Sequence, residues 1–181
     1  VNYLGSYRFE IKYSEPAGVK VGANQPSALM AMNRAIEMIS NLKTPYDLDK
    51  KAERTTYTVG VGSCTPASEG ERSKECTLLV DMRSPTPGPL KDIRSKIEPA
   101  FAKALQQENA KYGLKDGDAK AVKMELVWFG DRPAHKRKNY DDPAMQAFWQ
   151  SARTAGIDIH EKLNERAASL NDNVPAAVGV P

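Results

Sequence analysis

The first regular pattern along the chain is a strict alternation of apolar and polar residues over 6–14. One face of this segment carries Tyr7, Phe9, Ile11 and Tyr13, and the opposite face carries charged residues. Alternation with a period of two predicts a half-buried strand. The next pattern has apolar residues three or four positions apart and predicts a helix over 26–42. Its expected apolar face consists of Leu29, Met32, Ile36 and Ile39.

A second and a third strand follow, separated by a loop. β-Branched and aromatic residues alternate over 55–61, which favours a strand. The segment 62–74 is rich in Gly, Ser, Pro and Glu and predicts a loop, and an apolar run over 76–83 predicts the next strand. We expect these two strands to form a hairpin.

The third apolar period is again helical, with the residues Leu90, Ile93, Ile97, Phe101 and Ala104. This helix should end before Gly113. Pro99 lies inside it and is expected to kink or interrupt it, because proline lacks a backbone donor. A fourth strand is predicted over 122–129.

The order strand, helix, strand, strand, helix, strand predicts an α+β fold of the ferredoxin-like βαββαβ type. In such a sandwich two helices cover one face of a four-stranded antiparallel sheet, while the other face and the edges stay open. An amphipathic helix that starts at Pro143 predicts a helical C-terminal extension.

Composition narrows the class of protein. The 181 residues suffice for one domain, or one domain and part of another, and 40% hydrophobic with 27% charged residues is typical of a globular protein. No apolar run approaches the length of a membrane span, and the net charge of +3 is spread along the chain. We therefore expect neither a membrane nor a nucleic acid as partner. Because the sequence starts with Val1 in place of a methionine, and ends with Pro181 directly after the apolar residues 178–180, we expect it to be part of a longer protein.

Cys64 and Cys76 flank the loop of the predicted hairpin, where the two strands come close. A bridge between them would stabilise the fold by roughly 3 kcal/mol in the chain-entropy model. Two free thiols are the alternative. The compartment stays open with this question: cytoplasmic, or secreted or periplasmic if the two cysteines are bridged.

Few residues indicate chemistry on their own. The two histidines, His135 and His160, lack the spacing of a metal site, and no nucleophile elbow occurs, so we assign no catalytic residue and no metal ligand. Arg83 ends the third strand beside Asp81. It is either a solvated charge paired with its neighbour or a fork that binds a carboxylate.

Four features in this order carry a resemblance to a known family: the strand end Val80-Asp-Met-Arg-Ser84, the helix after it, the strand end Gly130-Asp-Arg-Pro133 and the tail 173–181. Together with the predicted fold, they resemble the lid or dimerisation domain of zinc-dependent exopeptidases of the aminoacylase and glutamate carboxypeptidase type. The resemblance divides the chain into a lid domain, 5–133, and a segment that returns into an incomplete catalytic domain, 134–181.

The resemblance implies a domain of a metal-dependent peptidase or amidohydrolase that acts on peptides or N-acyl amino acids and is not catalytic alone. Two zinc ions would be bound by the parent catalytic domain. A homodimer would form through the first helix and the edge of the second strand. Arg83 and Asn173 would be the substrate-binding residues: Arg83 would bind the substrate carboxylate, and Asn173 matches the Asn of a family motif in the tail. Val19 and Gly70 stand where the family has a His and an Asn that assist catalysis.

Two alternatives remain. The parent could be a dimerising homologue that has lost hydrolysis, because Val19 and Gly70 have no side-chain donor. The chain could instead be a stand-alone ferredoxin-like binding module, for example for RNA. The outer face of the third strand, with Thr77, Leu79, Asp81 and Arg83, lacks the aromatic residues on which RNA bases stack.

Overall fold

The protein has a mixed α+β architecture in a computed structural model that describes residues 2–20, 22–42, 55–65, 72, 74–136, 141–157, 167–168 and 171–179. The strands are β1 (Asn2–Tyr3), β2 (Gly5–Ser14), β3 (Thr56–Cys64), β4 (Glu75–Ser84), β5 (Lys123–Arg132), β6 (His135–Lys136) and β7 (Ala167–Ala168). The helices are α1 (Ala28–Ser40), α2 (Pro87–Ala110), α3 (Pro143–Thr154) and α4 (Asn173–Ala177). None of the described helices is long and apolar enough to cross a membrane.

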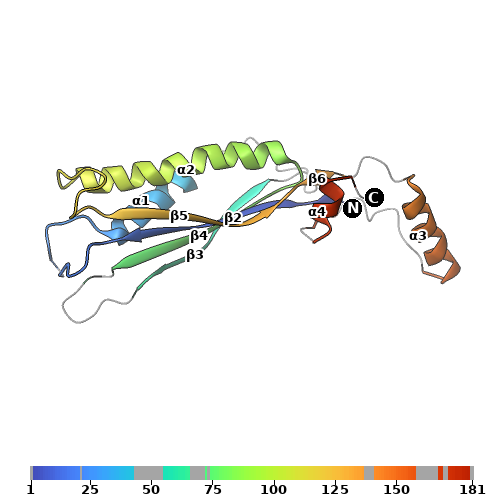
Figure 1. Cartoon of the computed structure of the whole chain (residues 1–181), viewed down its shortest axis with the longest axis horizontal. Coiled ribbons are helices and arrows are strands. Elements are labelled where there is room, and N and C mark those ends of the chain that lie inside the picture. The colour runs from blue at the N-terminus through green and yellow to red at the C-terminus, as the bar shows by residue number, and fades with distance from the viewer. Residues whose placement is uncertain are drawn as a thin grey trace.

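The main sheet has four strands in the order β3-β4-β2-β5, and all neighbours are antiparallel. Both α1 and α2 lie against the same side of this sheet (Figure 1). The other face of the sheet has no helix over it among the described elements. The prediction of an antiparallel sheet with two helices on one face is therefore confirmed, as are the four predicted strands and the hairpin of β3 and β4.

The core lies between the sheet and the two helices. Strands β2 and β4 bury alternate side chains on the helix-covered face, and these include Phe9, Ile11, Leu78 and Val80. Two ring contacts extend this core, one from Phe9 to Phe101 on α2 and one from Phe9 to Trp128 on β5. Burial of this apolar surface is the main driving force of the fold.

Helix α1 differs from its prediction in which residues it buries. Its buried side is formed by Ala28, Ala31, Met32, Ala35 and Ile39. Leu29, which we expected in the core, has 42% of its surface exposed. The buried positions follow the spacing i, i+3, i+4, i+7 and i+11 from Ala28, so Leu29 falls beside this stripe and stays exposed.

Helix α2 is continuous from Pro87 to Ala110, so the expected interruption at Pro99 is wrong. The proline is exposed, while Ile97 and Phe101 on either side are fully buried. Packing of these two side chains holds the helix across the missing backbone hydrogen bond. The end of the helix before Gly113 is as predicted.

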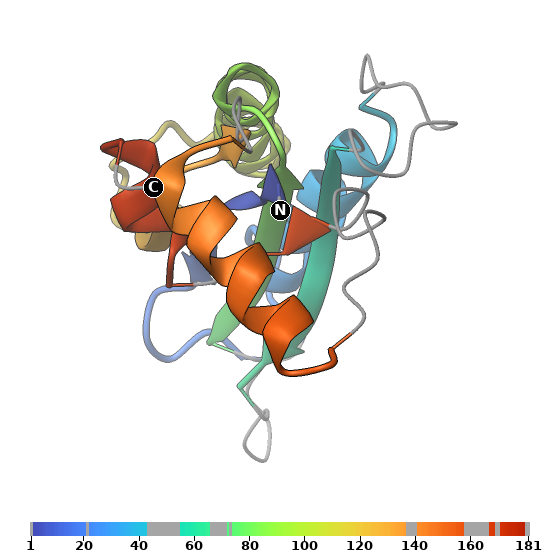
Figure 2. The same ribbon diagram turned by 90° about the vertical axis from the view of Figure 1, so that its right-hand side faces the viewer.

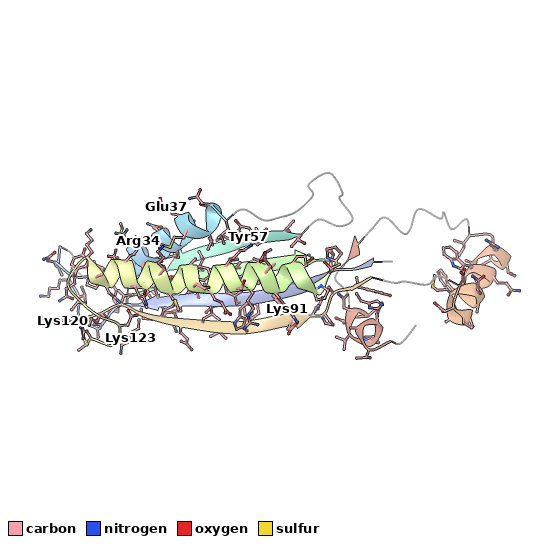
Figure 3. The ribbon with its side chains drawn as sticks, turned by 90° about the horizontal axis from the view of Figure 1, so that it is seen from above. Arg34, Glu37, Tyr57, Lys91, Lys120 and Lys123 are labelled. Carbon is pink, nitrogen blue, oxygen red and sulfur yellow. A yellow bond between two sulfur atoms is a disulfide. The ribbon has the colours of Figure 1, made fainter. Side chains whose placement is uncertain are left out.

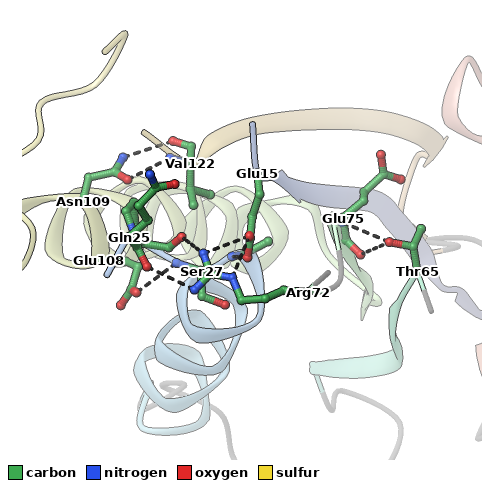
Figure 4. Close-up of polar contacts among 11 residues, drawn as sticks. Glu15, Gln25, Ser27, Thr65, Arg72, Glu75, Glu108, Asn109 and Val122 are labelled. Carbon is green, nitrogen blue, oxygen red and sulfur yellow. Dashed lines mark hydrogen bonds and ion pairs between the residues drawn. The ribbon is translucent and has the colours of Figure 1, made fainter. Parts of the chain in front are cut away.

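Two buried carboxylates bind the first turn of α1 (Figure 4). Glu108 accepts a hydrogen bond from the backbone N–H of Ser27 at 3.1 Å, and Glu15 accepts one from Ala28 at 2.8 Å. Each carboxylate also pairs with an arginine, Glu108 with Arg34 on α1 and Glu15 with Arg72. Because Ser27 makes no side-chain cap, these distant carboxylates satisfy backbone donors that the helix leaves open.

A second, smaller sheet lies at one end of the molecule. Strand β1 pairs with β6 on one side and with β7 on the other, and β6 and α4 lie at this end (Figure 1). Figure 2 views the molecule from this end, where α3 stands nearest the viewer. The small sheet thus joins the segment before β2 to the segment after β5. We call this the hinge end.

Candidate functional site

The first predicted site residue, Arg83, lies on the open face of the sheet near the hinge end. Its Nε donates a hydrogen bond to Oδ1 of Asp81 at 2.8 Å, and its Nη2 donates one to Oδ2 at 3.2 Å. Arg8 on β2 approaches the same carboxylate from the neighbouring strand, with 2.6 Å between its Nε and Oδ2. One carboxylate therefore orients two guanidinium groups.

The two arginines stabilise the charged form of the Asp81 carboxylate. Partial burial by itself would raise the pKa of Asp81, but hydrogen bonds from Arg83 and Arg8 outweigh burial and lower that pKa below its ordinary value. The hydrogen bond to Asp81 raises the pKa of Arg83 further. Both arginines keep about two fifths of their side-chain surface exposed, 40% for Arg8 and 42% for Arg83.

The strand register places a third arginine in the same region. Ser6 on β2 lies opposite Arg83 on one side and opposite Arg132 of β5 on the other. Ser6 is small and almost fully buried, so the surface between Arg83 and Arg132 lies close to the backbone of β2. We call Arg8, Arg83, Arg132, Asp81 and Ser6 the arginine cluster.

A glycine leaves space beside the cluster. Gly130 lies opposite Arg8 in the register of β2 and β5. A Cβ atom added to Gly130 would lie 3.1 Å from the Cβ of Arg8, closer than ordinary packing. The absence of a side chain at this position therefore lets the Arg8 side chain lie across β5.

The second predicted site residue, Asn173, is fully buried at the start of α4. Its Nδ2 donates hydrogen bonds to the backbone oxygens of Leu4 at 2.7 Å and Pro133 at 3.0 Å. Leu4 directly precedes β2 and Pro133 directly follows β5. Asn173 thus ties α4 to both chain crossings at the hinge end.

Of the two positions that depart from the pattern of the resembled family, the structure describes Val19 but not Gly70. Val19 is partly buried, and its backbone oxygen accepts a hydrogen bond from Arg72. Gly70 and His160, one of the two histidines that lack the spacing of a metal site, lie outside the described residues. His135 lies in β6, with its ring tilted toward that of Tyr3 and 6.2 Å between the ring centroids, at the hinge end.

The described residues do not assemble a metal site. They contain no group of three or more His, Cys, Asp or Glu side chains that could hold a metal ion. The donor set for a pair of zinc ions is therefore not assembled from this part of the chain.

Cys64 and Cys76 form a disulfide. The two residues lie directly opposite each other at the end of the β3–β4 hairpin, and Cys76 is fully buried on the core side. Of the two alternatives left open by the sequence, the structure has the bridged one. It joins the outermost strand of the sheet covalently to its neighbour.

The outer edge of β3 is the second candidate surface. None of its residues is charged and none is proline, and no described strand pairs with its outer side. At its start, the hydroxyl of Tyr57 donates to the backbone oxygen of Ile39 at 2.5 Å, which ties β3 to the end of α1. Figure 3 shows Arg34, Glu37 and Tyr57 along this side of the molecule. Edge strands that lack charges and prolines are open to pairing with another strand.

Sequence reasoning found Arg83 and Asp81 but missed Arg8 and Arg132 as their neighbours. The alternation over 6–14 already put Arg8 on the open face. What it lacked was the register, because Arg8 and Asp81 are 73 residues apart in the chain. Only the pairing of β2 with β4 brings them together.

Comparison with known proteins adds information on the fold. No family model matches the sequence, and no curated protein matches it. Solved structures do resemble the chain. An aminobenzoyl-glutamate utilization protein from Klebsiella pneumoniae superposes with a TM-score of 0.66 at 18% identity, covering 97% of this chain and 40% of that protein.

Two peptidases give similar values. Aminopeptidase PepT from Bacillus cereus has a TM-score of 0.64 at 14% identity, and a tripeptidase from Staphylococcus aureus has 0.63 at 17%. Both comparisons cover 100% of this chain but only 43% of the peptidase. The chain therefore has the fold of one part of such proteins and spans less than half of their length. At these identities the similarity establishes the fold alone.

Proposed function

We propose that this chain is the lid and dimerisation domain of a metal-dependent peptidase or amidohydrolase, with a segment that returns toward the catalytic domain. The lid comprises 5–133 and has the ferredoxin-like order of strands and helices. The return segment comprises 134–181. The parent protein acts on small peptides or N-acyl amino acids, and this chain has no hydrolytic activity alone.

The observation that carries the proposal is the coverage of the structural similarity. Nearly the whole chain superposes on less than half of two peptidases and of the aminobenzoyl-glutamate utilization protein. The small sheet at the hinge end supports the same interpretation, because it brings the entry into β2 and the exit from β5 side by side. A domain inserted into another domain has this arrangement of its two crossings.

A second copy of the chain is the proposed partner of the β3 edge and α1. The edge of β3 carries only neutral side chains, so two copies can pair along it without like charges meeting. On α1, Leu29 and Met30 expose 42% and 43% of their surfaces and would lose contact with water in such a dimer.

The dimer is tested by placing charge on the edge. Thr56 and Thr58 of β3 lie on the open face, and changing both to lysine should convert a concentration-dependent dimer to a monomer in sedimentation velocity. Thr77→Lys is the matched control, because Thr77 lies on the same face of the inner strand β4. A wild-type chain that stays monomeric at its highest soluble concentration would contradict the dimer proposal.

In the parent protein, Arg83 is proposed to bind the substrate carboxylate and Asn173 to belong to the same site or to hold the return segment that completes it. Two zinc ions would be bound by residues outside the part of the chain described here and would polarise the scissile carbonyl. Assays of the complete protein with added zinc, on dipeptides and N-acyl amino acids, test this. Arg83→Gln should raise KM by about tenfold or more, as loss of a charge-assisted fork predicts.

One observation favours a second candidate, a dimerising homologue without hydrolysis. Val19 stands in place of a catalytic His and offers a ligand only its backbone and an apolar side chain. If the complete protein with zinc cleaves none of these substrates but still dimerises through β3, this second function replaces the first.

A further inference from the structure

We infer that the disulfide between Cys64 and Cys76 makes dimerisation of the chain sensitive to redox conditions. While the bridge is closed, it holds the far half of β3, residues 60–64, to β4, so that the outer edge of β3 can pair with a second copy. Reduction by a dithiol releases this half and weakens the dimer. The inference rests on the proposed function for the dimer and goes beyond it by naming what regulates that interface.

The two ends of β3 are held to the rest of the protein in different ways. Near its start, the hydroxyl of Tyr57 donates to a backbone oxygen at the end of α1, and the hydroxyls of Thr55 and Ser84 share a buried hydrogen bond at 2.7 Å. At its far end, Cys64 is bonded to Cys76, which is fully buried. Among the described residues, this disulfide is the one side-chain bond that joins 60–64 to the rest of the sheet.

Between these two ends the strand is weakly built. Gly60 and Gly62 have no side chain to pack, and the register with β4 shifts between Val59 and Val61. Glycines and register shifts both weaken the pairing of a strand. Because no described strand pairs with the outer side of β3, backbone hydrogen bonds hold 60–64 from one side alone. The disulfide therefore determines how much of the time this half of the strand is ordered.

The same disulfide supports the second element of the proposed dimer surface, which is α1. Arg72 lies between the two cysteines in the sequence and binds the segment before this helix (Figure 4). Its Nε donates to the buried carboxylate of Glu15 at 3.1 Å, and its Nη1 and Nη2 donate to the backbone oxygens of Gln25 and Pro26 at 3.2 and 2.8 Å. Glu15 in turn accepts a hydrogen bond from the backbone N–H of Ala28, where α1 begins.

Without the bridge, hydrogen bonds alone close the base of the segment that carries Arg72. The backbone N–H of Thr65 donates to the backbone oxygen of Glu75 at 2.8 Å, and the N–H of Glu75 donates to Oγ1 of Thr65 at 3.1 Å (Figure 4). Exposed hydrogen bonds contribute little net free energy, because water replaces them. Reduction thus also loosens the contact of Arg72 with the first turn of α1, where Leu29 and Met30 are exposed.

The reaction is a thiol–disulfide exchange with a dithiol. Cys64 is partly exposed and Cys76 has no exposed surface, so a thiolate of the dithiol attacks Sγ of Cys64. The S–S bond breaks, and Cys76 leaves as a thiolate and takes up a proton. The second thiol of the reductant then forms a disulfide with the first and releases Cys64 as a thiol. In total the two cysteines gain two electrons and two protons, which the dithiol loses.

Sedimentation velocity of the chain with and without dithiothreitol tests the inference. If reduction lowers the ordered fraction of 60–64 to about one third in each copy, the dissociation constant of the dimer should rise about tenfold, because both copies must be ordered. Amide hydrogen exchange should quicken more in 60–64 and in the first turn of α1 than in β2. Circular dichroism verifies that the reduced chain keeps its sheet.

Two variants separate the bridge from other causes. The Cys64→Ser, Cys76→Ser double variant should dimerise as weakly as the reduced wild type and should not respond to dithiothreitol. Gly62→Thr should restore part of the dimerisation of the reduced chain, because a β-branched residue favours the strand. The added Cβ has room, since its nearest neighbour is Cδ1 of Leu78 at 3.5 Å. Gly88→Thr is the matched control, because it places the same residue on α2, where a Cβ meets nothing within 4 Å.

The outcomes distinguish this inference from the proposed function. Equal dissociation constants with and without dithiothreitol would overturn the inference and leave the proposed dimer standing, whereas an oxidised chain that stays monomeric would overturn both. A reduced chain that loses its circular dichroism as a whole would overturn the inference, because the release would not be confined to one part of β3. A Gly62→Thr variant that responds like the wild type would also overturn it, because order in 60–64 would then not control the dimer.

Discussion

The two faces of the main sheet are built from the same strands but differ in almost every physical respect. On the helix-covered face, Phe9 and Val80 are fully buried and make close apolar contacts. On the open face, one position along, Arg8 and Asp81 keep water contact and pair with each other. Stability therefore resides mainly on the helix-covered face, whereas the open face can carry charged side chains at little cost. Substitutions of equal size should therefore have very different costs on the two faces.

The largest effect is expected for Phe9→Ala. Phe9 has no exposed surface and contacts the rings of Phe101 and Trp128, at 5.8 and 4.5 Å between centroids. Its truncation leaves a cavity between sheet and helix and should lower the free energy of unfolding by about 3–5 kcal/mol. Chemical denaturation followed by circular dichroism measures this change.

Phe129→Ala is the matched control on β5. Phe129 has 54% of its surface exposed and lies at the irregular step in the β2–β5 register. Its truncation should change the free energy of unfolding by no more than about 0.5 kcal/mol. Equal losses for Phe9→Ala and Phe129→Ala would contradict the division of the sheet into a stabilising and a free face.

The disulfide gives the next effect. It lies on the core side and closes a loop with a sequence separation of 12 between Cys64 and Cys76. Removing it in a Cys64→Ser, Cys76→Ser double variant should cost roughly 3 kcal/mol of unfolding free energy, because the unfolded chain gains loop entropy. A reducing agent should destabilise the wild type by a similar amount. It should leave the double variant unchanged, and a reductant effect on both would point to a cause other than this bridge.

Glu108→Gln probes buried charge in the helix layer. The carboxylate is fully buried and accepts hydrogen bonds from Ser27 at 3.1 Å and from Arg34 at 3.0 Å. Glutamine keeps one acceptor but loses the charge that faces Arg34, so we expect a loss of about 2 kcal/mol in thermal or chemical unfolding. Glu125→Gln is the control on the open face, where the side chain is 64% exposed and only 3.8 Å from Lys12. A cost for the control as large as for Glu108 would refute the argument from burial.

The assignment of residues to the two faces of the sheet was predictable from sequence, whereas the contacts between residues of different strands and helices were not. Alternation with a period of two assigned the residues of β2 and β4 to the correct sides, because burial of one face repeats every second residue. The same reasoning misplaced Leu29, since an apolar residue at the border of a helical stripe has no mark that distinguishes it from the core. The interruption expected at Pro99 was wrong for a related reason. The free energy lost with one backbone hydrogen bond is smaller than the free energy gained by burying Ile97 and Phe101 on either side of it.

Long-range polar contacts had no sequence signal. The carboxylate of Glu108 caps α1 from 81 residues away, and Arg8 meets Asp81 across two strands whose register no local pattern sets. For the candidate site, Arg83 could be named because it ends a strand beside an Asp. Its neighbours Arg8 and Arg132 could not, because each comes from another strand.

The smallest effect is expected for Asp81→Asn, the counterpart of Glu108→Gln on the open face. Asp81 pairs with two arginines, but all three side chains are partly exposed, so the pairs should contribute only about 0–1 kcal/mol at neutral pH. The pKa of Asp81 is lowered in the folded protein from a value of 3.8, so the unfolded state binds the proton more readily. The stabilisation is therefore present above about pH 4 and is lost as the pH falls through the lowered folded pKa. Unfolding free energies of wild type and Asp81→Asn should differ at pH 7 and converge toward pH 2, whereas a difference that grows with acidity would contradict this sign. Asp92→Asn on α2, paired with Lys96 in one exposed helical turn, controls for the general effect of removing a surface carboxylate.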